Sequence, residues 1–262
     1  ENQNLRFATS KTYTLPQSKE ISPYQYVSLS FSSEGNPNLK PSDNYNLDLK
    51  WDYYLSSSEL LSAGVFYKHI KHPIGRVDKG NSAGLLTYDN ISNFADLLGV
   101  EIEIRKNLYA KENHSGTNSK KISMGMNVSY IHTFLNLKLT NTPERKSGLE
   151  GASPFILNSD LTYTYTQNEK SFISSFVFNF FSDRIYTIGA LGFNDIKEKG
   201  IPSLDIATAY KFNSKWTLKF KASNLFNPTF IKFGESSTSN ESIQLNEFSK
   251  GVNVSLGVSF DL

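Results

Sequence analysis

The sequence has no cysteine and only two methionines, carries a net charge of +2, and contains no long hydrophobic run. Without cysteine it has neither a disulfide framework nor thiolate metal ligands, although this absence alone does not decide the compartment. So small a net charge offers no reason to expect nucleic acid as a partner. Its longest apolar stretches, such as residues 176–181, fall far short of the roughly 20 residues that a membrane-spanning helix needs, which excludes transmembrane helices.

Strict alternation of apolar and polar residues is what the chain has instead. Residues 252–262 alternate Val, Leu and Phe with small or polar residues up to the last position, which predicts a strand with one apolar face. Residues 44–55 alternate in the same way, and a dry core would strand the charges of Asp48, Lys50 and Asp52. Lipid on one side and a wet lumen on the other satisfy both faces, as in a closed transmembrane barrel.

Alternation of this kind predicts about ten strands joined by two classes of connection. Short connections at 56–59, 167–170 and 213–215 alternate with long ones at 15–41, 77–93, 141–152, 189–200 and 235–248; residues 110–120 are a longer member of the short class. Short periplasmic turns and long extracellular loops are typical of outer-membrane barrels, and they put the carboxyl terminus on the periplasmic side. Segments 110–120 and 235–248, rich in Ser, Asn, Glu and Thr, are predicted to be mobile.

The final strand also carries a possible assembly signal. Ser255, Gly257, Phe260 and Leu262 fit a pattern that resembles the terminal signal read by the bacterial barrel assembly machinery. An ordinary amphipathic last strand is the alternative interpretation.

Five segments resemble the carboxy-terminal barrel of Bacteroidetes TonB-dependent receptors of the SusC-like kind. They are residues 35–41 (GNPNLKP), 66–74 (FYKHIKHPI), 99–103 (GVEIE), 149–155 (LEGASPF) and 223–228 (SNLFNP). The resemblance implies an antiparallel up-and-down barrel of 22 strands, closed by an amino-terminal plug and driven by the TonB complex to import a nutrient. The chain departs from this pattern because it has no plug and only about ten strands. Residues 1–262 are therefore expected to be one partial barrel domain, the carboxy-terminal half. Its expected partners are outer-membrane lipid and the remaining strands and plug, with a surface lipoprotein lid as a further candidate.

Charged residues on the polar faces of the strands are predicted to face the lumen, because Lys or Arg on the lipid face costs about 2–4 kcal/mol near the midplane. Plug contact and a merely solvated wall are both open interpretations. The set is Asp48, Lys50, Asp52, Glu101, Glu103, Arg105, Asp160, Asp205, Lys219 and Lys221.

Aromatic residues of the long loops offer stacking surfaces for a ligand, although interfacial anchoring would also explain them. They are Tyr24, Tyr26, Tyr88, Phe193, Phe233 and Phe248. No metal site, cofactor or catalytic residue is predicted. His69 and His72 are three residues apart, on opposite faces of a strand, and the spacing of His72, Asp89 and Asp96 specifies no water-activating site.

The sequence thus favours a non-enzymatic transporter of the bacterial outer membrane that imports a nutrient such as a glycan, siderophore or peptide. Two alternatives stay open. One is a self-contained ten-stranded barrel acting as a porin, adhesin or protease, and the other is a soluble β-sandwich that serves as a binding module.

Overall fold

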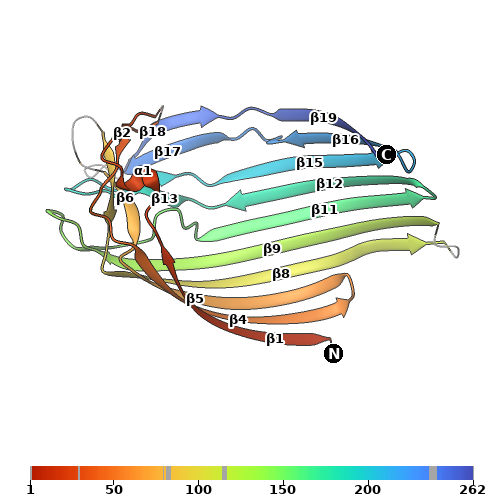
Figure 1. Ribbon diagram of the computed structural model, residues 1–262, viewed down its shortest axis with the longest axis horizontal. Helices are drawn as coiled ribbons and strands as arrows, with labels where there is room; N and C mark the ends of the chain where they lie inside the picture. Colours follow the sequence, from red (N-terminus) through yellow and green to blue (C-terminus); the bar gives the residue numbers. More distant parts are fainter. Residues whose placement is uncertain are drawn as a thin grey trace.

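Ten long antiparallel strands form one continuous meander in the computed structural model, which describes residues 2–28, 30–78, 80, 84–113, 117–235 and 241–261 (Figure 1). Each strand pairs with the next along the chain, so the sheet is built from local connections. In sheet order the strands are β1 (Gln3–Thr14), β4 (Ser42–Ser56), β5 (Glu59–Lys71), β8 (Phe94–Glu112), β9 (Asn118–Leu137), β11 (Phe155–Gln167), β12 (Lys170–Phe181), β15 (Ile201–Lys211), β16 (Trp216–Ser223) and β19 (Asn253–Phe260).

The predicted short turns all lie at one end of this sheet, where both chain termini also lie (Figure 1). The turns between β4 and β5 and between β11 and β12 begin and end where the sequence predicts them. In the second of these turns, Asn168 adopts a left-handed φ of 52°, a conformation that Asn tolerates well in a tight hairpin. The turn between β8 and β9 is shorter than predicted, because both strands continue into residues 110–120.

The long connections lie at the opposite end and contain regular structure of their own (Figure 1). A short helix, α1 (Ser18–Ile21), precedes β2 (Gln25–Tyr26), and β10 (Arg145–Ser147) adds to the edge of β9. Two four-stranded sheets complete the long-loop end. The first orders β2, β3 (Ser33–Glu34), β7 (Leu86–Asn90) and β6 (Ile74–Asp78), and the second orders β13 (Arg184–Thr187), β14 (Ile196–Glu198), β17 (Thr229–Glu235) and β18 (Ser242–Ser249).

These two loop sheets contact each other. Val77 of β6 and Ile188 form a parallel bridge, in which the Ile188 N–H donates to the Arg76 carbonyl oxygen at 2.8 Å. The main buried apolar cluster lies beneath this bridge and includes Val77, Ile91, Leu135, Leu137 and Ile188. The core of the molecule is therefore at the long-loop end. Residues 242–248, which were expected to lie in a long loop, belong to β18.

The strand register separates the main sheet into two chemically different faces. One cross-strand row is apolar on all eight strands from β1 to β15: Leu5, Trp51, Ala63, Ile102, Val128, Leu157, Phe180 and Pro202. The adjacent row, on the other face, is polar throughout: Asn4, Asp52, Ser62, Glu103, Asn127, Asn158, Asn179 and Ser203. We call these the apolar face and the polar face.

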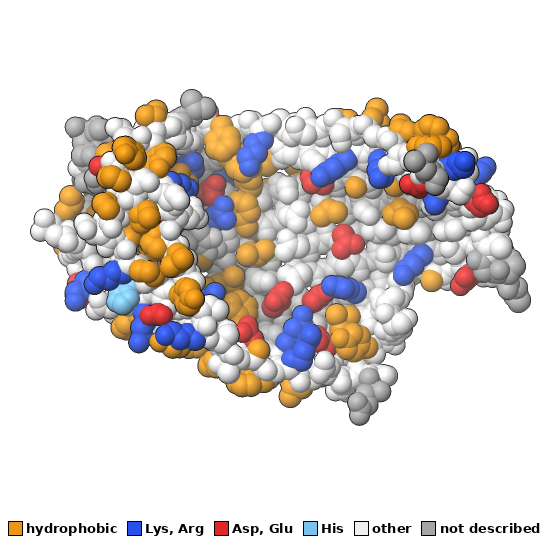
Figure 2. Space-filling model, viewed as in Figure 1, with side chains coloured by type: hydrophobic (Ala, Val, Ile, Leu, Met, Phe, Trp, Pro, Cys, Tyr) orange, Lys and Arg blue, Asp and Glu red, His pale blue; other side chains and the backbone are white. Residues whose placement is uncertain are grey.

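The apolar face is strongly exposed. Leu256 of β19 keeps 75% of its surface accessible and Phe7 of β1 keeps 68%. Figure 2 shows a hollowed face of the molecule on which Lys, Arg, Asp and Glu side chains are scattered among mainly uncharged polar surface over the strands. A soluble sandwich packs its apolar faces together, so this exposure argues against the β-sandwich alternative.

Candidate ligand-binding site at the long-loop end

A cluster of cations and aromatic rings joins the two loop sheets. Tyr186 of β13 lies at its centre: the Arg76 guanidinium carbon is 4.4 Å from the ring centroid and the Lys232 ammonium nitrogen is 4.1 Å from it. Phe31 and Phe248 surround the same ammonium at 5.7 and 5.8 Å. We call these five residues, together with Tyr88 at 6.0 Å from Arg76, the loop cluster.

Glu150 supplies a negative charge on one side of the loop cluster. Its carboxylate accepts the backbone N–H of Arg76 and lies 3.5 Å from the guanidinium nitrogen Nη2. Burial raises the pKa of the Glu150 carboxyl, and the Arg76 charge offsets part of that rise. Burial also raises the pKa of the Tyr186 hydroxyl, which keeps this ring neutral.

Lys232 is the most unusual member of the loop cluster, because only 7% of its surface is accessible to solvent. Burial lowers the pKa of its ammonium; the Glu198 charge raises it, and the Arg76 charge lowers it. Glu198 lies directly opposite Lys232 in the pairing of β14 with β17, but its carboxylate accepts a 2.8 Å hydrogen bond from Nε of Arg184.

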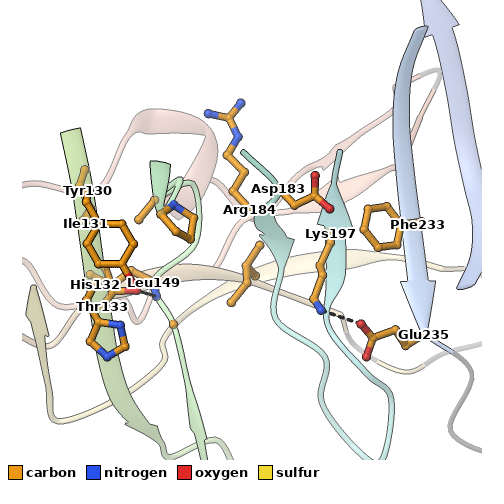
Figure 3. Close-up of a pocket in the computed structure, with 14 residues that line it drawn as sticks. Tyr130, Ile131, His132, Thr133, Leu149, Asp183, Arg184, Lys197, Phe233 and Glu235 are labelled. Atoms are coloured by element: carbon orange, nitrogen blue, oxygen red, sulfur yellow. Dashed lines mark hydrogen bonds and ion pairs between the residues drawn. The ribbon is translucent and has the colours of Figure 1, made fainter. Parts of the chain in front are cut away.

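A second feature is an open cleft of about 450 Å³ at the edge of β9, which we call the wall cleft. In Figure 3, Tyr130 and His132 of β9 line one side, while Lys197 of β14 and Phe233 of β17 line the other. The Lys197 ammonium donates to the Glu235 carboxylate at 2.6 Å, so this cation already has a partner. The cleft therefore offers mixed polar and apolar surface without a concentrated charge.

The structure distributes the six predicted aromatic residues over different places. Tyr88 and Phe248 belong to the loop cluster, and Phe233 lines the wall cleft. Tyr24, Tyr26 and Phe193 lie outside both features and are largely exposed. Arg76, Lys232 and Tyr186 were not predicted from the sequence, because single charged or aromatic residues within loops carry no pattern.

All ten predicted lumen residues share the polar face in the strand register. Lys50 and Arg105 lie 3.3 and 2.7 Å from the Glu103 carboxylate, and Arg105, Asp160 and Asp205 lie in one cross-strand row. Asp52 is buried, and one of its oxygens is bound by Arg6. Asp48, Lys219 and Lys221 are exposed, and Glu101 accepts a hydrogen bond from Asn127.

The residues of the assembly pattern lie on β19, the last strand of the main sheet. Ser255 pairs with Lys221 and Gly257 with Lys219, while the Phe260 ring lies 4.7 Å from the Trp216 ring. Leu262 is outside the described residues.

The histidines and carboxylates considered as a possible rim site lie in different surroundings. Nδ1 of His69 lies 2.8 Å from the Asp96 carboxylate, which also accepts the Tyr67 hydroxyl, whereas His72 and Asp89 lie in the connection beyond β5. Within the described ranges, no group of three or more His, Asp or Glu side chains is placed to hold a metal ion. None of the helices in those ranges is long and apolar enough to cross a membrane.

Comparison with known proteins gives a family match over the main sheet from β1 to β16, short of β19. Residues 1–225 match a family model described as TonB dependent receptor-like, beta-barrel. A sequence comparison with curated proteins found no significant match.

Three solved structures share the fold of the chain. The ferric enterobactin receptor of Pseudomonas aeruginosa is 13% identical, with a TM-score of 0.57 over 100% of this chain and 39% of its own. The ferric yersiniabactin uptake receptor of Yersinia pestis is 12% identical, with a TM-score of 0.57 over 99% of this chain and 35% of its own. An iron transporter of Neisseria meningitidis is 14% identical, with a TM-score of 0.53 over 84% of this chain and 31% of its own. The chain thus spans less than two fifths of the length of each.

Proposed function

Because this chain belongs to the TonB-dependent receptor-like β-barrel family, we propose that it forms the carboxy-terminal part of the wall of a receptor that imports a nutrient across the bacterial outer membrane. Members of this family are outer-membrane receptors and transporters rather than enzymes. The observation that carries the proposal is the ten-stranded meander with one continuous apolar face and one continuous polar face.

The dimensions of the apolar face support a position in the bilayer. On β8, Asp96 and Lys106 flank the apolar positions 98, 100, 102 and 104 of the same face. The ten residue steps from Asp96 to Lys106 span roughly 33 Å along the strand. A strand tilt of about 40° reduces this distance to roughly 25 Å along the membrane normal, which is the usual height of the apolar band. The polar face would then line the lumen, and the ten charged residues named above would face the plug or the water around it.

Two open edges support the interpretation as a partial barrel. In the part of the chain that the structure describes, β1 pairs only with β4, and β19 pairs only with β16 in the main sheet. A self-contained ten-stranded barrel would join these two strands. We propose instead that further strands and a plug of the same receptor complete the wall, and that the plug engages the TonB complex.

The nutrient and the subfamily are finer proposals. A ferric siderophore is the first ligand to test, since all three structural relatives named above are iron receptors. The five sequence motifs favour a Bacteroidetes SusC-like receptor, for which a glycan or peptide substrate and a surface lipoprotein lid are the alternatives.

Uptake by the complete receptor tests the function. Cells that express the full reading frame should accumulate ⁵⁵Fe from a ferric siderophore only when TonB is present, and deletion of residues 1–262 should abolish uptake. Accumulation that persists without TonB would contradict a TonB-dependent mechanism. Failure with siderophores, but TonB-dependent growth on one glycan or peptide, would move the substrate to that class.

A further inference from the structure

The charges of the loop cluster and its surroundings do not balance. Three cations, Arg76, Arg184 and Lys232, share this region with two carboxylates, Glu150 and Glu198. Glu150 is engaged by Arg76, and Glu198 is engaged by Arg184. The ammonium of Lys232 is the charge that is left without a counterion among these five groups.

Lys232 has no oxygen acceptor for its N–H groups within the described residues, where its nitrogen contacts the rings of Tyr186, Phe31 and Phe248. Aromatic faces attract a cation, but they replace only part of the hydration that a buried ammonium loses. A second cation at the same ring adds repulsion. An anion beside the ammonium would offset this cost, since a charge held in a mostly buried side chain without a counterion is unfavourable.

Arg76, which lies on the other loop sheet, also has a hydrogen-bond donor without a partner. Its nitrogen Nη1 is buried and has no hydrogen-bond partner, although Nη2 lies near Glu150. The side chain as a whole keeps 19% of its surface exposed, so a solute can approach it from solvent. Buried donors without partners are rare in native proteins and are commonly explained by a bound water or ion.

We propose that Arg76 and Lys232 form an anion-binding site that takes a carboxylate or phosphate group, with the Tyr186 ring between the two cations. An oxyanion supplies an acceptor for Nη1 of Arg76 and for the ammonium of Lys232, and it neutralises the unbalanced charge. Phe31 and Phe248 favour an anion that carries an apolar body, since both rings lie against the ammonium. The inference deepens the proposed function, because it gives the loops a chemical preference for what they capture, yet binding itself requires no import.

The complete receptor, purified in detergent, provides the test. Its thermal unfolding midpoint is measured with increasing sodium benzoate or sodium phosphate, each against sodium chloride at equal ionic strength. A saturable rise with benzoate, phosphate or both is expected for the parent protein, and the comparison of the two salts shows which source the site accepts. Lys232→Met should raise the salt concentration that gives half of the maximal shift at least tenfold. Arg76→Gln should do the same.

Lys250→Met is the matched control, because the Lys250 ammonium also lies over an aromatic ring, 4.1 Å from the Phe230 centroid, but the residue is exposed and lies outside the loop cluster and the wall cleft. This variant should keep the parent response. The proposal is overturned if neither salt exceeds chloride for the parent, or if Lys232→Met and Arg76→Gln respond as the parent does. Loss of uptake with intact anion binding would contradict the transport function alone, so the two failures are distinguishable.

Discussion

At the residue scale, Lys232 combines a side chain that is mostly buried with a positive charge that, among the described residues, lies against aromatic rings. Removing a charge that has no counterion removes its desolvation cost and leaves no partner charge unpaired. We therefore expect Lys232→Met, without added anion, to unfold at the same temperature as the parent or up to a few degrees higher. A clear loss of stability in thermal unfolding would show that the charge itself holds the loops together.

The pH dependence of stability should report the same lysine. Its pKa is lowered in the folded protein relative to the ordinary value of 10.5, so between these two values the unfolded chain binds more protons than the folded one. Stability contributed by this site should therefore rise as the pH increases through the folded pKa, up to about 10.5. The thermal unfolding midpoint of the parent should rise between pH 7 and 10.5, and this rise should be absent in Lys232→Met. Equal slopes of midpoint against pH in the two proteins would contradict a lowered pKa for Lys232.

At the element scale, Gly99 of β8 shows how two neighbouring strands fit together. A Cβ added to Gly99 would lie only 2.1 Å from the ring of Phe66, its cross-strand partner on β5. Gly99→Ala should thus destabilise the sheet by about 1–3 kcal/mol through overpacking. Phe66→Ala in the same chain should recover much of this loss, which a double-mutant cycle measures.

Gly64→Ala is the control for this prediction, because the nearest atom to its added Cβ is 3.6 Å away, an ordinary contact. The packing explanation fails if Gly64→Ala and Gly99→Ala are equally destabilising, or if the double variant is no better than Gly99→Ala.

At the scale of the whole molecule, the two faces of the sheet predict opposite responses to charge. Leu256 lies on the apolar face of β19 and Ser255 on the polar face. Leu256→Arg should cost up to about 2–4 kcal/mol of membrane folding stability, depending on its depth. Ser255→Arg should cost clearly less, because it faces the wet lumen and meets only the like charge of Lys221 opposite it. Folding of the complete receptor into lipid vesicles, followed by the heat-modifiable gel shift, measures the difference. Equal folding yields for the two variants would exclude a lipid-facing Leu256.

Most of the main sheet was predictable from local pattern. Residues 44–55 were expected as a strand and lie in β4, and most of 252–262 lies in β19, because the alternation repeats over many residues. The extensions of β8 and β9 into 110–120 were missed, since their exposed polar residues weaken the alternation.

The long-loop end was beyond such prediction. Its short strands pair across large sequence separations: Val77 meets Ile188, and Lys232 meets the ring of Phe31. Of the predicted ligand residues, Tyr88 and Phe248 lie in the loop cluster. Aromatic side chains are common in packed loops, and the sequence did not specify which residues would be their neighbours.

The sequence by itself determined that the chain folds as an amphipathic meander with long loops at one end, since side-chain alternation and turn length act over neighbouring residues. Only the tertiary structure decided that Arg76, Tyr186 and Lys232 meet, because they come from three different loops and no local rule relates them. It also decided which charges lack partners. A lysine in a sequence is solvated by default, and only the packing of rings that are distant in the sequence buries most of the Lys232 side chain.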